Sequence, residues 1–206
     1  YPLSSVLDQV KSKDILLLEI SDHQLCDIHE FKTNISVLTN ICPTHLDYHG
    51  SYAHYMLTKK KIFNLHTTAD IAVLNKANED SLKISKDIPS KKIYFNDANN
   101  YYKDGFIYLH GEQYLNVDDI RLKGSHNYEN ILAALLVLEN FNLDKSLVVE
   151  FLKNFGGVAH RLEFVAEKSG VEYYNDSKST NPTATITALK TFQKPIHLIL
   201  GGLDRN

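Results

Sequence analysis

The chain has 206 residues, of which 43% are hydrophobic and 23% charged, and its formal net charge is −3. This composition is ordinary for a globular protein that buries a sizeable core, and the charge gives no reason to expect a nucleic-acid partner. No apolar stretch approaches the length of a membrane span, and the N-terminus lacks the pattern of a signal peptide, so we expect a cytoplasmic protein without membrane insertion. Two cysteines, Cys26 and Cys42, are too few for a disulfide framework or a four-cysteine zinc site.

Apolar runs and helical patterns alternate along the first half of the chain. The runs cover residues 15–20, 35–40 and 71–74, and residues 51–65 between the last two carry apolar side chains at helical spacing. Long apolar runs are typical of strands that are buried on both faces of a parallel sheet. The alternation therefore predicts an α/β fold, with a mostly parallel sheet flanked by helices.

Shorter strands are expected at residues 91–95 and within 101–117. The dipeptide Asp104–Gly105 is a good hairpin-turn signal between them, and His110–Gly111 is a weaker one. This region therefore reads as antiparallel hairpins that follow the parallel strands.

Two helices are predicted next, at residues 127–141 and 146–154, with Asp144 as a cap for the second. The inward stripe of the first helix consists of Ile131, Leu132, Leu135 and Leu138. Both helices have room to cover a sheet face, which agrees with the layered fold.

The best candidate domain boundary is the Asn-Phe-Gly-Gly-Val segment at residues 154–158. The pattern restarts after it, with strands at 162–166, 171–174 and 196–200, a turn at Ser169–Gly170, and a helix that opens at Pro182. We expect one domain over residues 1–157 and the beginning of another over 158–206, because the last stretch is too short for a complete α/β domain.

Five segments in order resemble the Mur ligase family of ATP-dependent amide ligases. They are residues 19–25, residues 39–41 leading to 45–47, Lys59, residues 124–130, and His160–Arg161 followed by 175–181. Their order and spacing over nearly the whole chain carry the resemblance. It implies the family's central ATP-binding domain, followed by the start of a Rossmann-like C-terminal domain.

The resemblance implies two magnesium ions as cofactors. The residue matching Glu19 binds the Mg²⁺ that bridges the ATP phosphates, and the residue matching His45 contacts a second Mg²⁺. The lysine matching Lys59 is carbamylated, which turns a cation into an anion beside the metals. Its neighbours Lys60 and Lys61 leave the register open by a residue, and by themselves these groups also fit a solvent-facing acid, a hydrogen-bonding histidine and a surface lysine.

The resemblance also implies a set of nucleotide contacts. Asn127 and Asn130 match asparagines near the adenine of ATP, although helix capping alone would explain one of them. Arg161 and Lys178 match cations that approach the phosphates and the developing charge, and Asp176 matches an acid that orients the nucleotide. From these residues alone, a surface ion pair between Asp176 and Lys178 is an equally good interpretation.

Two details resemble the family members that add D-glutamate to UDP-N-acetylmuramoyl-L-alanine. Ser21 and Gln24 match a stretch close to that sugar nucleotide, as does His45, and Arg205 falls where a cation would meet the side-chain carboxylate of D-glutamate. Thr180 matches a position near the incoming amino acid. The pair Asp22–His23 departs from the commoner Ser-Phe, so the local substrate contacts stay open.

The reaction implied is the ATP-driven joining of a carboxylate to an amine in the synthesis of cell-wall precursors. The carboxylate of UDP-N-acetylmuramoyl-L-alanine attacks the terminal phosphate to give an acyl phosphate, and the amine of D-glutamate then displaces phosphate from it. The chain contains no G-x-x-x-x-G-K-[ST] loop, which cradles the ATP phosphates. We therefore expect a segment of a longer, monomeric enzyme that is inactive by itself.

Three other readings remain open from the sequence. Within the family, the chain could belong to a ligase that adds the third residue, or to a folylpolyglutamate-type ligase. Outside catalysis, it could be a ligase-like binding module without a phosphate loop. The stretch His45, Asp47 and His49 also has the residue types of a metal-dependent hydrolase.

Overall fold

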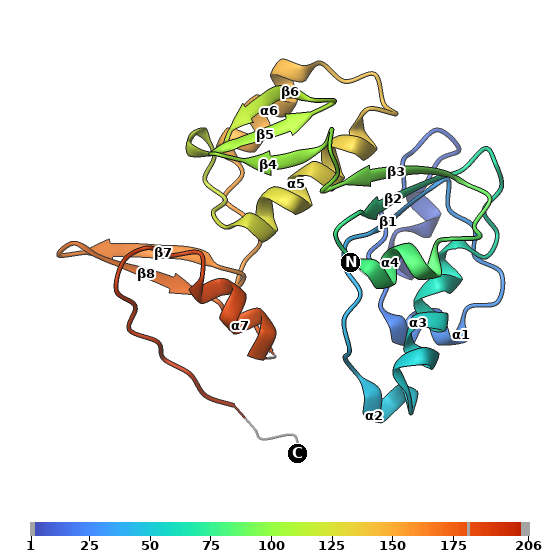
Figure 1. Cartoon of the computed structure of the whole chain (residues 1–206), viewed down its shortest axis with the longest axis horizontal. Helices are drawn as coiled ribbons and strands as arrows, with labels where there is room; N and C mark the ends of the chain where they lie inside the picture. Colours follow the sequence, from blue (N-terminus) through green and yellow to red (C-terminus); the bar gives the residue numbers. More distant parts are fainter. Residues whose placement is uncertain (1–2, 181, 203–206) are drawn as a thin grey trace.

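Three parallel strands form the central sheet of the chain, whose computed structural model describes residues 3–180 and 182–202. They are β1 (Ile35–Leu38), β2 (Ile71–Asn75) and β3 (Lys91–Phe95), in the order β1-β2-β3 (Figure 1). Strands β1 and β2 start where the apolar runs predicted them, and the α/β fold class is confirmed. Strand β3 has the bounds of the shorter strand predicted at 91–95, but it pairs in parallel with β2 instead of joining the hairpins.

The middle strand, β2, carries the core on both of its faces. Val73 pairs with Val37 on β1 and with Ile93 on β3. Ala72 and Leu74 belong to one cluster of buried apolar side chains and Val73 to another, so alternate side chains serve opposite faces of the sheet. This explains why the strand reads as an unbroken apolar run.

Helices cover the two faces of this sheet. On the face of Ala72 and Leu74 lie α3 (Tyr52–Lys60), which continues as the 3₁₀ turn η3 (Lys61–Phe63), and α4 (Glu79–Ile84). On the face of Val73 lies α5 (Ser125–Leu138) (Figure 1). The predicted helix over residues 51–65 is therefore confirmed.

A small antiparallel sheet packs on α5. Its strands are β4 (Tyr101–Lys103), β5 (Phe106–Leu109) and β6 (Glu112–Asn116). The turns Asp104–Gly105 and His110–Gly111 have positive φ at both residues, 48° and 82° in the first and 55° and 82° in the second. Both predicted hairpins are confirmed, because only such left-handed two-residue turns match the twist of the strands.

The two predicted helices after the hairpins are present with shifted bounds. The first, α5, begins two residues before the predicted Asn127 and ends at Leu138. The second is α6 (Lys145–Asn154), and the carboxylate of Asp144 accepts a hydrogen bond from the Ser146 N–H at 2.7 Å, which confirms the predicted cap. The Asp144 cap fixes the start of α6. The end of α5 carries no such local signal, which explains why its predicted bound is shifted.

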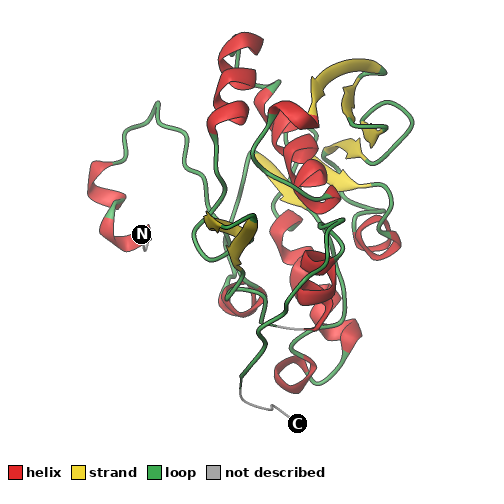
Figure 2. Ribbon diagram, turned by 90° about the vertical axis from the view of Figure 1, so that its left-hand side faces the viewer, coloured by secondary structure: helices red, strands yellow, loops and turns green. Residues whose placement is uncertain are grey.

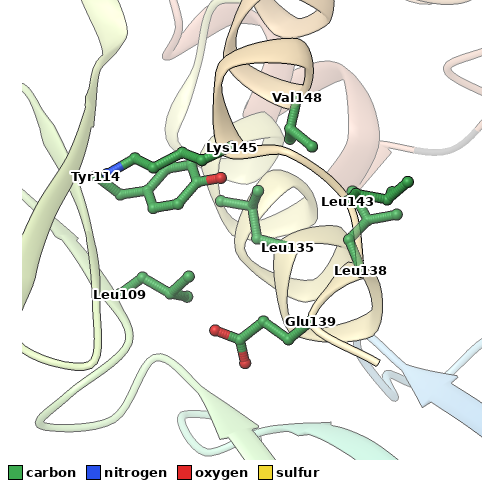
Figure 3. A pocket seen from close by; sticks show the side chains of 8 residues that line it. All are labelled: Leu109, Tyr114, Leu135, Leu138, Glu139, Leu143, Lys145 and Val148. Carbon is green, nitrogen blue, oxygen red and sulfur yellow. The ribbon is translucent and has the colours of Figure 1, made fainter. Parts of the chain in front are cut away.

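A small hollow of about 100 Å³ lies between the antiparallel sheet and helices α5 and α6 (Figure 3). It is lined by Leu109, Tyr114, Leu135, Leu138, Glu139, Leu143, Lys145 and Val148. None of these residues is a predicted site residue, and most are apolar. The hollow is therefore a packing feature of the core rather than the candidate site.

The chain after α6 forms a hairpin and a helix. Strands β7 (Glu163–Lys168) and β8 (Val171–Asn175) are antiparallel and joined at Ser169–Gly170, where φ is 53° and 78°, as the predicted turn requires. Helix α7 (Pro182–Leu189) follows at the predicted proline (Figure 1). The boundary near residue 157 stays a prediction.

Two predicted strands, at residues 15–20 and 196–200, are wrong. Both segments lack regular secondary structure, and Leu17 and Ile199 are 92% and 98% exposed. An apolar run becomes a strand only when a neighbouring strand takes up its backbone hydrogen bonds, and no described strand pairs with either segment. Glu19 consequently stands in an extended, exposed segment rather than at the end of a buried strand.

Several short elements complete the fold. They are η1 (Leu3–Ser5), η2 (Leu7–Gln9), α1 (Asp22–Asp27), α2 (Leu46–His49) and η4 (Val117–Asp119). Figure 2 shows the chain from the side, with the helices in red around the yellow strands. Within the described ranges, no helix is long and apolar enough to cross a membrane.

Candidate functional site

The start of α1 places two of the predicted substrate residues. Ser21 caps the helix, since its Oγ accepts from the backbone N–H of Gln24 at 3.2 Å, and the Gln24 Oε1 accepts from the Ser21 N–H at 2.9 Å. These two bonds form a capping box, in which each side chain satisfies the other residue's backbone N–H. The Ser-x-x-Gln spacing signals this motif, and the sequence reading missed it.

Asp22, the first residue of α1, is buried and accepts a hydrogen bond from His49 at the end of α2, with 2.7 Å between Oδ2 and Nε2. Burial alone would raise the pKa of the Asp22 carboxyl, but this bond, its own backbone N–H and the nearby charges of Lys59 and His45 hold the pKa below its usual value. The sequence did not predict this hydrogen bond between Asp22 and His49.

Two predicted metal residues flank this carboxylate. His45 is the N-cap of α2, and its ring lies 5.1 Å from the ring of His23, centroid to centroid. Lys59 is in the last turn of α3, with its Nζ 5.9 Å from the centroid of the Tyr55 ring. The charges of both residues act to lower the pKa of the Asp22 carboxyl, and helices α1 and α2 both pack on α3.

The structure also separates the three consecutive lysines of α3 and η3. Lys61 donates from its Nζ to the backbone carbonyl of Cys26 at 2.7 Å, so it ties the end of α1 to the following turn. Lys59 lies beside Tyr55 and acts on Asp22. Of these two lysines, Lys59 is the one whose charge acts on the buried carboxylate, and the register of the predicted site lysine stays a prediction.

Glu19 precedes the Ser21 cap by two residues and is exposed. In residues 3–180 and 182–202, no three His, Cys, Asp or Glu side chains lie close enough to hold a metal by themselves. Magnesium is commonly bound by one or two carboxylates together with phosphate oxygens and water. Glu19, an exposed carboxylate two residues before the Ser21 cap, is of the ligand type that such a shared magnesium ion takes.

The positions of His45, Asp47 and His49 do not support the alternative of a metal-dependent hydrolase. His49 is buried and donates to Asp22, while His45 and Asp47 are exposed at the other end of the same helical turn. A hydrolytic centre needs at least three converging ligands, and the described part of the chain brings no such set together.

The predicted adenine residues lie in and after the first turn of α5. Asn127 donates from its Nδ2 to the backbone carbonyl of Lys123 at 2.7 Å, which braces the helix start, and Asn130 is exposed. Gly124, the N-cap, has φ 99°, and a Cβ there would approach the His126 ring and the Thr191 hydroxyl to 2.7 Å. Only glycine fits this close approach.

A polar pocket of about 400 Å³ lies next to this helix start. It is lined by Tyr102 from β4, Gly124, Ser125 and Tyr128 around the start of α5, and Thr187, Lys190, Thr191 and Gln193 from α7 and the residues after it. The pocket therefore opens between the central part of the chain and the segment after residue 157.

His126, at the start of α5, is influenced by Arg161 and Asp176, two of the predicted nucleotide residues. Burial lowers the pKa of the His126 imidazole; the nearby Asp176 acts to raise it and Arg161 to lower it further. Two residues that are 35 or more positions away in sequence thus lie near this helix start. The structure brings Asn127, Arg161 and Asp176 into one neighbourhood.

Arg161 stands between two residues in the left-handed region, His160 with φ 67° and Leu162 with φ 44°. Asp176 holds this bend, because its Oδ1 accepts from the Leu162 N–H at 3.0 Å and its Oδ2 accepts from the Ser179 hydroxyl at 2.5 Å. Such strained residues persist only where the surroundings hold them, and they gather at functional sites.

The described residues show no ion pair between Asp176 and Lys178, and each Asp176 carboxylate oxygen accepts a hydrogen bond from another group. The Lys178 side chain is exposed, and its backbone N–H donates to the His160 carbonyl at 3.0 Å. Thr180 is exposed as well. Arg205 lies outside the described residues.

The predicted residues thus fall into two groups. The first group lies on α1, α2 and α3 or at their starts and consists of Ser21, Gln24, His45 and Lys59, preceded in sequence by Glu19. In the second group, Asn127 is in the first turn of α5, and Arg161 and Asp176 act on the neighbouring His126. No hydrogen bond or ion pair between described residues joins one group to the other.

Comparison with known proteins identifies relatives over the whole chain. The Mur ligase middle domain matches residues 2–138. The UDP-N-acetylmuramoylalanine–D-glutamate ligase of Streptococcus pneumoniae strain CGSP14 is 43% identical over an alignment that covers 100% of this chain and 47% of that protein. The chain therefore spans about half the length of the curated relatives it matches.

Solved structures share the fold at lower sequence identity. MurF from Acinetobacter baumannii superposes with a TM-score of 0.66 at 16% identity, over 77% of this chain and 37% of that one. MurF ligase from Thermotoga maritima in complex with ADP gives a TM-score of 0.55 at 21% identity, over 77% of this chain and 38% of that one.

These matches agree with the order of motifs in the sequence and with the parallel sheet and helices of the structure. The family match covers most of the chain, and the relative from S. pneumoniae aligns with all of it. The chain belongs to the Mur ligase family.

Proposed function

We propose that this chain is part of an ATP-dependent ligase that joins D-glutamate to UDP-N-acetylmuramoyl-L-alanine during the synthesis of peptidoglycan precursors. The observation that carries the proposal is the 43% identity, over the whole chain, to a protein named for that reaction. The Ser21–Gln24 start of α1 and the two groups of polar residues support it. The whole protein is proposed to be a cytoplasmic monomer.

The proposed reaction needs two steps that balance in charge. The carboxylate oxygen of the sugar nucleotide bonds to the γ-phosphorus of ATP, and ADP leaves to give an acyl phosphate. The amine of D-glutamate then bonds to the acyl carbon, the C–O bond to phosphate breaks, and the amine proton is lost to a base. Both steps concentrate negative charge, so positioned cations and metal ions account for most of the catalysis.

The residues of the chain take proposed roles in this scheme. Glu19 and His45 would hold magnesium ions together with ATP oxygens, and a carbamylated Lys59 would add an anion beside them. Magnesium supplies charge neutralisation at the phosphates when bound. Ser21 and Gln24 are proposed to lie against the sugar nucleotide.

The group at the start of α5 is proposed to serve the nucleotide and the amino acid. Asn127 and Asn130 would face adenine, whose ring edge needs both a donor and an acceptor. Arg161 would neutralise developing charge, held in its bend by Asp176, which also orients the nucleotide. The remaining proposed contacts are Lys178 at the phosphates, Thr180 near the incoming amino acid and Arg205 at its side-chain carboxylate.

The test is an assay of the whole protein for release of ADP and phosphate in the presence of UDP-N-acetylmuramoyl-L-alanine, with amino acids added one at a time. The proposal requires release with D-glutamate only. Release with a different amino acid would assign the chain to another ligase of the family. A folded whole protein that releases no ADP with any of them would favour a non-catalytic binding module.

A further inference from the structure

Asp22 and His49 form a buried pair that the proposed reaction does not use. The Asp22 residue is 5% exposed and the side chain of His49 is fully buried. The Nε2 of His49 lies 2.7 Å from Oδ2 of Asp22, and the two residues belong to different helices, 27 positions apart in sequence. Because a carboxylate only accepts, the imidazole donates from Nε2, which fixes its orientation.

The carboxylate is surrounded by groups of the proposed site. His23 places its Nδ1 3.4 Å from Oδ2, and the charges of Lys59 and His45 act on the same carboxylate. The His49 ring, in turn, packs edge-on against Tyr55 at 5.3 Å between ring centroids. Asp22 is therefore an acceptor at the junction of α1, α2 and α3.

Besides the bond to Asp22, α2 is held by the His54 ring, whose Nδ1 lies 3.1 Å from the His49 carbonyl oxygen, and by the Tyr48 ring, 4.2 Å from that of His23 between centroids. Helix α2 is a single turn, and His49 is its only buried residue, whereas Leu46, Asp47 and Tyr48 are exposed. The other ring nitrogen of His49, Nδ1, is buried without a hydrogen-bond partner among the described residues. The bond to Asp22 is consequently the single polar anchor of the His49 side chain.

The same turn presents His45. The His45 carbonyl accepts hydrogen bonds from the backbone N–H groups of Tyr48 at 3.1 Å and His49 at 3.0 Å, so the two histidines are the two ends of one hydrogen-bonded turn. His45 has φ 52°, in the left-handed region that few residues other than glycine occupy.

We propose that Asp22 and His49 are a positioning pair, which clamps the α2 turn onto the start of α1 and thereby fixes the position of His45 at the beginning of that turn. Neither residue needs to touch substrate for this role. The inference rests on the proposed function in one respect, since the proposed metal and substrate role of His45 is what makes its position matter.

The first test measures the stability of the α2 turn directly and does not depend on which reaction the protein carries out. Amide hydrogen exchange on the whole protein is compared between wild type, Asp22→Ala and Asp27→Ala, which removes an exposed carboxylate from the same helix. We expect exchange at the Tyr48 and His49 amides to quicken roughly tenfold in Asp22→Ala, with β2 unchanged. Unchanged exchange at both amides would overturn the proposal.

The second test separates positioning from stability. In the ADP-release assay, Asp22→Ala should lower kcat/KM for the sugar nucleotide by about tenfold or more per folded molecule, as removal of a residue behind a site ligand commonly does. Asp22→Asn keeps an acceptor oxygen and should recover most of the loss. Asp27→Ala should match wild type. A purely structural pair would lower the folded fraction and leave kcat/KM unchanged, which contradicts the proposal.

A double variant completes the test. If the two residues act as one unit, Asp22→Ala combined with His49→Ala should lose no more activity than the worse single variant. Losses that multiply would show independent roles and reject the pair. Absence of D-glutamate-dependent turnover in wild type would refute the proposed reaction instead, and the exchange experiment would still decide whether the pair holds the turn.

Discussion

At the scale of single residues, Lys59 is the side chain whose chemistry the proposal depends on most. Lys59→Ala removes the proposed site of carbamylation, and with it the anion that would help to hold the magnesium ions. We expect kcat of the whole protein to fall by about a hundredfold or more, because groups that stabilise transition-state charge are commonly worth that much. Lys60→Ala is the matched control and should keep wild-type kcat. Equal losses of kcat in both variants would contradict the assignment of Lys59 as the proposed carbamylation site.

His66 predicts how stability depends on pH. Its ring is buried, with Nε2 2.8 Å from the Thr33 hydroxyl and 3.0 Å from the Ser36 hydroxyl. Burial lowers the pKa of the imidazole, and the charge of Lys32 lowers it further, against an opposing effect of Asp70. The unfolded chain therefore takes up a proton first, as pH falls below about 6.5.

The stability that neutral His66 contributes is thus complete above that pH and is lost as pH falls toward the folded-state pKa. Urea denaturation of the whole protein at intervals between pH 8 and 5 measures the slope. We expect His66→Gln to show a shallower fall in the free energy of unfolding than wild type over this range. Parallel curves for the two proteins would mean that His66 does not titrate on unfolding.

At the scale of elements, local signals were the most dependable guide. The turns at Asp104–Gly105 and at His110–Gly111 require positive φ, which glycine and a few polar residues adopt cheaply, so the sequence marks them directly. Strand β3 was predicted with its observed bounds for a similar reason, since apolar periodicity is set within the segment. The runs at 15–20 and 196–200 failed because a strand also needs a partner.

The turn at Gly105 supplies a stability prediction for the β4–β5 hairpin. Gly105 has φ 82° with open space around its Cα, so a Cβ meets no neighbour and only the backbone conformation opposes it. Gly105→Ala should lower the free energy of unfolding by about 1 kcal/mol, the usual cost of a left-handed alanine. Gly156→Ala, at a position of equal space without positive φ, should leave the denaturation midpoint in place.

At the scale of the whole molecule, the chain contains the proposed site groups without a phosphate-cradling loop. Its 206 residues include no G-x-x-x-x-G-K-[ST] sequence, whose backbone N–H groups bind ATP phosphates in other ATPases. We expect the isolated 206-residue chain to release no ADP from ATP above the uncatalysed rate, with or without both proposed substrates. Turnover by this chain, with the whole protein assayed in parallel, would show that the loop is dispensable.

The sequence by itself determined the α/β class, strands β1 and β2, the hairpin turns and the resemblance to the family, because periodicity, turn residues and motif order are set along the chain. The parallel pairing of β3 with β2 was decided by the tertiary structure. Only the tertiary structure decided that Asp22 pairs with His49, that Ser21 and Gln24 close a helix start, and that Asp176 holds the bend at Arg161. The first and third of these join residues far apart in sequence. Such hydrogen bonds exist only after the fold has brought their donors and acceptors together, so no local pattern announces them.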